Sequence, residues 1–105
     1  MMDPKEIRYN ARFLALGNGK KAIQLAEGII ERLCVIADKR TDEWTRANNS
    51  SEYRKSTVHR ARWANIEKQR EQIEMEFEFF YCAEVTWPGL YPVVTCKDGK
   101  QIYIY

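Results

Sequence analysis

The sequence has few cysteines and a single histidine. Cys34, Cys82 and Cys96 lie far apart, and no Cys-x-x-Cys pair or nearby histidine accompanies them. An odd number of cysteines cannot all form disulfides, and this spacing is not that of a zinc site. We therefore predict three reduced thiols buried as small apolar side chains, and no bound metal or other cofactor.

Long apolar runs are also lacking. No stretch approaches the roughly 18 apolar residues that a membrane-spanning helix needs. The segment Met1–Glu6 has neither the apolar core nor the cleavage site of a secretory signal. We expect a cytoplasmic protein without a membrane partner.

A large net charge is missing as well. The 17 Lys and Arg residues against 15 Asp and Glu residues leave +2, so composition alone indicates neither nucleic acid nor an anionic membrane as a partner. The 105 residues, of which 45% are hydrophobic, suffice for one core but not for two. We predict a single domain over residues 1–105.

Proline is scarce, and none interrupts the chain between Pro4 and Pro88. Long helices can therefore form between them. Asp3 before Pro4 is typical of a helix start, and the flexible Gly17-Asn18-Gly19 is typical of a helix end. This pattern predicts a short helix over 3–16.

A second helix is predicted over 20–46, because apolar residues recur there at steps of three and four. Its apolar face comprises Ala22, Ile23, Leu25, Ala26, Ile29, Ile30, Leu33, Ile36 and Ala37. Gly28 lies within this helix, where glycine costs about 1 kcal/mol relative to alanine. We expect a neighbouring helix or an aromatic ring to approach the backbone at Gly28.

A third helix is predicted over 51–83. Its apolar seam runs at alternating steps of four and three through His59, Trp63, Ile66, Arg70, Ile73, Phe77 and Phe80. The segment Glu74–Phe79 instead alternates charged and apolar residues, as a half-buried strand would. We favour a helix over 74–81, because Glu, Met and Gln form helices well and β-branched residues are absent, and a strand is the alternative.

The end of the chain predicts extended structure. Residues 93–96 and 101–105 are rich in β-branched and aromatic residues, and they flank Lys97-Asp98-Gly99-Lys100. Asp-Gly at this position favours a two-residue type I′ turn, which predicts a β-hairpin over 93–105. The expected fold is α+β and mainly α, with a short N-terminal helix, a long antiparallel helical hairpin and a C-terminal β-hairpin.

The predicted third helix carries opposite charges in its two halves. The cations of its first half are Arg54, Lys55, Arg60 and Arg62, whereas the charges from Glu71 to Glu84 are five glutamates. This order opposes the helix dipole, so we expect compensation by the neighbouring helix. An antiparallel hairpin would place Lys20 and Lys21 near Glu76 and Glu78, and Asp38, Asp42 and Glu43 near Arg54, Lys55 and Arg60.

No residue pattern indicates catalysis. His59 has no acid or cysteine in its own turn, and Gly17-Asn18-Gly19-Lys20-Lys21 lacks the spacing and the preceding strand of a phosphate-binding loop. Glu74, Glu76 and Glu78 belong to a charged run without a polar pocket beside them. We expect no enzyme, and we name no catalytic, cofactor-binding or metal-binding residue.

The aromatic residues indicate a binding surface. Eight of them fall in the last 29 residues, more than one small core easily covers. Exposed Trp and Tyr are typical of protein interfaces, where charged residues select the partner. The predicted partner-binding residues are Arg60, Arg62, Trp63, Glu74, Glu78, Phe79, Tyr81, Trp87 and Tyr91.

We therefore expect a small non-catalytic module that binds a protein partner and also forms a homodimer. In size, charge and lack of a catalytic signature, the chain resembles small bacteriophage or mobile-element accessory proteins that block a host protein complex. One alternative is a nucleic-acid-binding protein, because Arg54, Lys55, Arg60 and Arg62 interleave with Tyr53 and Trp63. Another is a structural or assembly subunit.

Overall fold

Helices dominate the computed structural model, which describes all 105 residues. The elements follow in the order α1 (Pro4–Leu14), α2 (Lys20–Asn49), α3 (Ser51–Arg54), α4 (Thr57–Tyr81), β1 (Glu84–Thr86), β2 (Val93–Thr95) and β3 (Gln101–Tyr103). The predicted α+β fold with a long helical hairpin is confirmed. No helix has the length and apolar character needed to cross a membrane.

Local capping explains where the helices begin and end. The Asp3 carboxylate accepts a hydrogen bond from the Lys5 backbone N–H at 2.8 Å, and Pro4 occupies the first turn of α1. The prediction of one unbroken helix over 51–83 is wrong. The Ser56 hydroxyl interrupts it, because it donates to the Tyr53 carbonyl at 2.6 Å and accepts from the His59 N–H at 3.1 Å.

Residues 74–81 are helical, which confirms the favoured reading over the strand alternative. The helix then ends at Cys82, which has a φ of 51° in the left-handed region. The Cys82 N–H donates to the Glu78 carbonyl, and the Ala83 N–H donates to the Phe77 carbonyl. This pattern closes the last turn of a helix and reverses the chain into β1.

The C-terminal hairpin is present, but it belongs to a three-stranded antiparallel sheet in the order β1-β2-β3. The added strand pairs Glu84 with Thr95. The predicted type I′ turn is wrong, because it needs a positive φ at both central residues and only Gly99, at 91°, has one. The Asp98 carboxylate instead accepts from the Lys100 N–H at 3.0 Å, which holds a longer turn.

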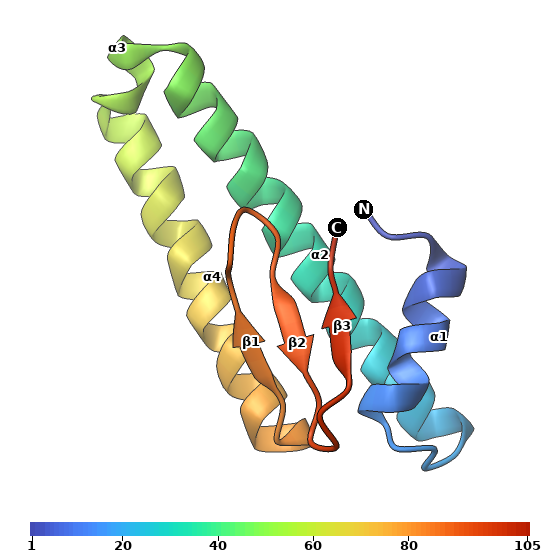
Figure 1. The fold of residues 1–105 in the computed structure, drawn as a ribbon. Helices are drawn as coiled ribbons and strands as arrows, with labels where there is room; N and C mark the ends of the chain where they lie inside the picture. The colour runs from blue at the N-terminus through green and yellow to red at the C-terminus, as the bar shows by residue number, and fades with distance from the viewer.

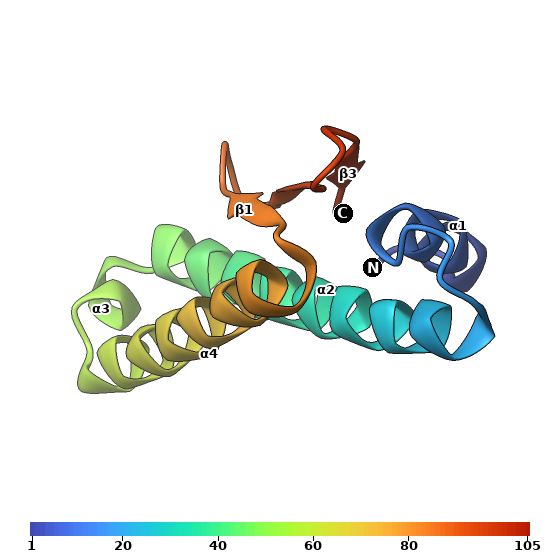
Figure 2. The same ribbon diagram turned by 90° about the horizontal axis from the view of Figure 1, so that it is seen from below.

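The sheet and α1 pack on the same side of the α2–α4 pair. Figure 2 shows this arrangement, in which the opposite side of the two long helices is uncovered. A cluster of 19 buried residues joins α1, α2, the second half of α4 and the sheet, with Phe77, Ile30 and Leu33 at full burial. The tip of the hairpin, with α3, extends beyond the sheet (Figure 1), and the molecule measures 50 × 25 × 22 Å.

The long helices are antiparallel, but their ion pairs differ from those we predicted. Glu76 bonds to Arg32 rather than to Lys20 or Lys21. The helices cross so that residues nearer the middle of α2 face the end of α4. Arg54, Lys55 and Arg60 were expected to lie near Asp38, Asp42 and Glu43, but they form no ion pair with these acids. Glu43 instead points inward, toward His59 and Arg62.

Candidate functional site

The single histidine belongs to a buried polar network at the hairpin tip. Glu43 is only 4% exposed, and one of its carboxylate oxygens lies 2.6 Å from the Tyr53 hydroxyl and 2.7 Å from His59 Nδ1. Burial opposes ionisation of Glu43, but these two hydrogen bonds and the charges of His59 and Arg62 outweigh it and lower its pKa. His59 thus fastens α4 to α2.

Three of the predicted interface residues serve the interior of this chain. The Trp87 indole donates to Glu74 at 2.6 Å, and the guanidinium of Arg40 lies 4.9 Å from the Trp87 ring centre and 5.6 Å from that of Trp63. These contacts connect the loop after β1 to both long helices. Trp63, Glu74 and Trp87 therefore hold the sheet against the hairpin, and Tyr91 also packs against the core.

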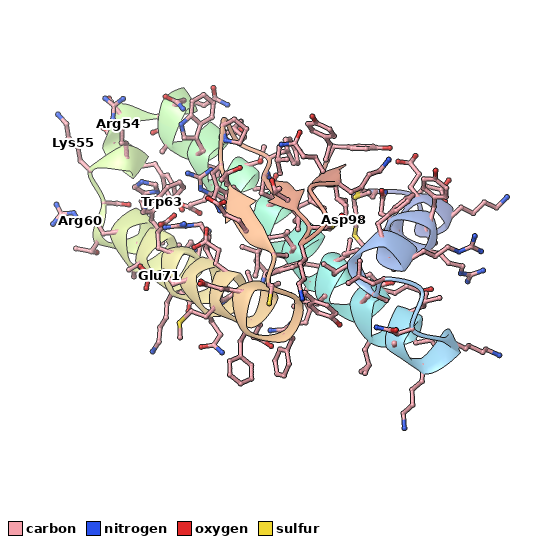
Figure 3. The ribbon with its side chains drawn as sticks, turned by 60° about the horizontal axis from the view of Figure 1, so that its bottom comes forward. Arg54, Lys55, Arg60, Trp63, Glu71 and Asp98 are labelled. Atoms are coloured by element: carbon pink, nitrogen blue, oxygen red, sulfur yellow. The ribbon has the colours of Figure 1, made fainter.

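The predicted cations lie at the far tip, away from the core. Figure 3 shows Arg54, Lys55 and Arg60 pointing outward there, whereas Trp63 lies between α4 and α2. None of the three cations forms an ion pair within the chain, and Arg62 is the one tip cation that approaches an acid, at 3.9 Å from Glu43. A basic surface thus exists at the tip.

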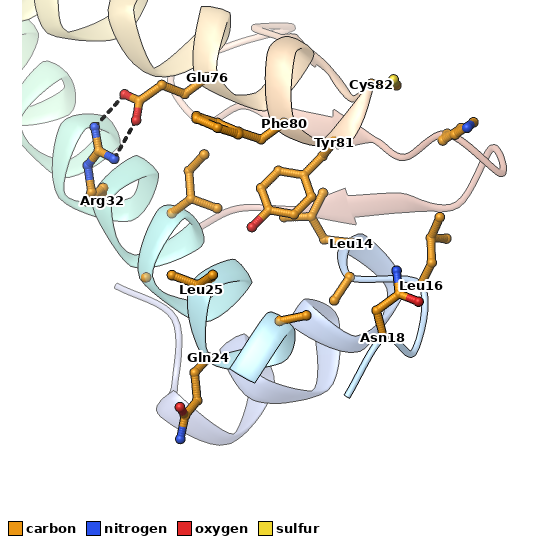
Figure 4. Close-up of a pocket in the computed structure, with 15 residues that line it drawn as sticks. Leu14, Leu16, Asn18, Gln24, Leu25, Arg32, Glu76, Phe80, Tyr81 and Cys82 are labelled. Carbon is orange, nitrogen blue, oxygen red and sulfur yellow. Dashed lines mark hydrogen bonds and ion pairs between the residues drawn. The ribbon is translucent and has the colours of Figure 1, made fainter. Parts of the chain in front are cut away.

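A concave, mainly apolar surface lies at the end of the hairpin opposite the tip. We call it the proximal groove, and it has a volume of about 680 Å³ between the end of α1, the first half of α2 and the end of α4. Figure 4 shows the rings of Phe80 and Tyr81 above Leu25, with Leu14 and Leu16 toward the α1 side. Nine of its 15 lining residues are hydrophobic.

Two lining residues were predicted to belong to the core and do not. Leu25 and Phe80 are each 65% exposed. Both fell on apolar seams of the sequence, but the helices carry more apolar surface than α1 and the sheet cover. The apolar face left over forms the walls of the proximal groove.

The expectation for Gly28 was also wrong within this chain. A Cβ built at Gly28 would meet no atom within 4 Å, so neither a helix nor an aromatic ring of the same molecule approaches it. Gly28 lines the proximal groove and also a second hollow of about 640 Å³ between α2 and α4. Gly28 therefore lies on an open surface of α2.

The groove also holds both non-glycine residues with a positive φ. Leu16 has a φ of 52° and Cys82 a φ of 51°. Such a conformation costs about 1 kcal/mol for an ordinary side chain, and strained residues cluster at functional sites. The Leu16 side chain is also 50% exposed and lines the groove.

The polar groups of the groove indicate what it could accept. Arg32 and Glu76 satisfy each other through two hydrogen bonds of 2.9 and 2.6 Å, which lower the pKa of Glu76. Lys97 is then the one lining charge without a partner in the chain. Burial raises the pKa of Tyr81, whose hydroxyl makes no hydrogen bond within the chain and is free to donate one.

Of the residues predicted to bind a partner, Tyr81 alone lines the proximal groove. Phe79 was also predicted and is the most exposed of the large apolar residues, at 81%, but it does not line the groove and instead contacts the ring of Phe80. Leu16, Leu25 and Phe80 were missed. The available signal was that each long helix carries apolar residues on more than one face.

Comparison with known proteins assigns no family to this arrangement. No family model, curated protein or solved structure matches the chain. The structure also contains no group of three or more His, Cys, Asp or Glu side chains placed to hold a metal ion. The site is therefore interpreted from its geometry alone.

Proposed function

We propose that the chain is a protein-binding module and that its proximal groove accepts an apolar segment of a partner protein that also carries a carboxylate. The exposure of Leu25 and Phe80 on facing walls of one groove is the observation that carries the proposal. Contiguous exposed apolar surface in a soluble domain is typical of a binding site.

The chemistry of the partner follows from the groove's polar groups. Because Arg32 is neutralised by Glu76, Lys97 leaves the groove with one positive charge. A carboxylate on the partner would meet Lys97, and it could also accept a hydrogen bond from Tyr81. A segment with apolar residues on one side and Asp or Glu at one end fits both features.

The open space beside Gly28, which lines the groove, favours a helix as the form of this segment. A glycine without neighbours lets another backbone approach closely, and helix-in-groove binding uses apolar residues on one helical face. The resemblance to accessory proteins adds the prediction that binding blocks the partner. Assembly into a larger structure is the alternative, and it predicts growth beyond a dimer in sedimentation.

The test uses a random peptide library displayed on yeast cells. The wild-type protein should enrich peptides that combine apolar residues at helical spacing with Asp or Glu. These peptides should bind the double variant Leu25→Ser, Phe80→Ser at least about tenfold more weakly, because each lost apolar contact is worth roughly 1.5 kcal/mol or more. Lys97→Glu should reduce binding of the acidic peptides most.

A matched control is available at the end of the chain. Tyr105 is half-exposed and lies outside the groove, so Tyr105→Ser should leave peptide affinity unchanged. Circular dichroism should show that every variant keeps its fold, since the altered side chains are exposed. Failure to enrich any peptide, or equal binding to the double variant, would refute the proposed function.

A further inference from the structure

A second seam runs along α4 on the side away from the core. Its exposed residues follow alternating steps of three and four, through Val58, Ala61, Asn65, Lys68, Gln72, Met75 and Phe79. The two ends of the seam are apolar, as at a helix–helix contact, with Val58 and Ala61 at one end and Met75 and Phe79 at the other, while the residues between them are polar. Met75 and Phe79 are largely exposed, and no element of the chain covers the seam.

The charges beside this seam are also left without partners. Arg60 in the first half of α4 forms no ion pair in the chain, and neither do Glu71 and Glu78 in the second half. Figure 3 shows Glu71 on the outer side of α4. Arg32 and Arg40 of α2 pair with Glu76 and Glu67, whereas Arg60, Glu71 and Glu78 are exposed and open to a charged group of another chain.

We propose that a second copy of this chain packs on the seam, with the two α4 helices antiparallel. A two-fold axis near residue 70, close to the middle of Thr57–Tyr81, would bring Ala61 of one copy opposite Phe79 of the other. The same register sets Asn65 opposite Met75. Small residues of one helix then receive the large residues of the other.

The same register also complements the charges. Arg60 of one copy lies beside Glu78 of the other, and this pair occurs twice in a two-fold interface. In this antiparallel arrangement, the positive N-terminal end of the partner's α4 lies beside the acidic second half of α4. The dipole of α4 itself disfavours acidic residues in that half. One helix therefore carries both halves of a self-complementary interface, and this favours a second copy over an unrelated partner.

The second hollow gives the partner room. Asn65, Lys68 and Gln72 of the seam line one wall of this 640 Å³ space, and Val35 of α2 lies on the other. Side chains of the second α4 could enter it. The seam contains no residue of the proximal groove, although the ring of Phe79 lies 5.1 Å from that of Phe80. Variants of Arg60 and Glu78, which touch neither groove wall, therefore test the dimer separately from the proposed peptide binding.

The experiment measures mass by sedimentation equilibrium from about 1 to about 200 µM, because dimerisation depends on concentration. The wild-type protein should approach twice the chain mass of 12.4 kDa. Arg60→Glu and Glu78→Arg should each raise the dissociation constant at least about tenfold. The combined variant exchanges both signs and should return to within about threefold of the wild-type value.

Rescue by the combined variant separates this interface from simple damage to the fold. Phe79→Ser should be a monomer over the same range, whereas the control Tyr105→Ser should dimerise like the wild type. A wild-type monomer at every concentration would overturn the proposal, as would two single variants that dimerise normally. The same solutions are mixed with a fluorescent DNA oligonucleotide, and a monomer that binds it through Arg60 would instead support the nucleic-acid alternative.

Discussion

Replacing Gly28 with alanine should make the protein more stable. Gly28 lies in the interior of α2, its φ is not in the positive range, and an added Cβ would meet nothing within 4 Å. Alanine loses less backbone freedom than glycine when a helix forms. No lost contact opposes this gain.

The magnitude follows from helix propensity alone. Glycine is about 0.8 to 1.0 kcal/mol less favourable than alanine inside a helix. For a domain of roughly 100 residues, such a gain raises the Tm by about 4 to 6 °C. Gly99→Ala provides the opposite case, because its site is equally open but its φ is 91°. That variant should be destabilised by about 1 kcal/mol.

Thermal and urea unfolding followed by circular dichroism measure both effects. The unfolding should be recorded at low protein concentration so that association contributes little. If Gly28→Ala were no more stable than the wild type, α2 would not have the open environment described here. If it were stabilised but still bound the selected peptides unchanged, Gly28 would not be needed for close approach in the groove.

Three further outcomes are expected. Glu43→Gln should lower the free energy of unfolding by about 2 kcal/mol or more, because it weakens a buried network. Because folding lowers the pKa of Glu43, its stabilising contribution should be complete above the ordinary carboxyl pKa of 4.5. This contribution should be lost as the pH falls through the lower pKa of the folded state. Acid unfolding of the wild type and of Glu43→Gln measures the difference. Trp87→Phe should cost about 1 to 2 kcal/mol through the lost bond to Glu74, measured by urea unfolding. Cys82 is exposed, so the prediction of three buried thiols is wrong for this residue. A thiol reagent should label Cys82 rapidly and Cys34 and Cys96 only on unfolding, since burial raises the pKa of both buried thiols.

The helices could be predicted because their signals are local. Asp3 and Pro4 mark the start of α1, and the apolar period of α2 is nearly continuous. The break at Ser56 was missed because several serines precede α4 and each could cap a helix. Which hydroxyl does so depends on the position of Tyr53, whose own hydroxyl is held by Glu43 on another helix.

The proximal groove could not be predicted from the same patterns. Periodicity identifies Leu25 and Phe80 as apolar positions of a helix, but it does not say which apolar face the sheet and α1 will cover. The aromatic residues near the end of the chain were predicted as one binding surface, but the Trp87 indole bonds to Glu74 within the chain, whereas Phe79 contacts the ring of Phe80 and stays 81% exposed. Only the packing of distant segments separates these cases.

The hairpin tip has a consequence for motion. Its buried residues, Ala47 and Ile66 with Glu43, stand apart from the main core cluster, so the tip is fastened chiefly by polar bonds. Such a region can open while the rest of the fold stays closed, because local opening requires less free energy than global unfolding. Backbone amides around His59 should therefore exchange with solvent sooner than those around Phe77. The hairpin tip would then unfold and refold locally while α1, the sheet and the adjoining halves of the long helices stay folded.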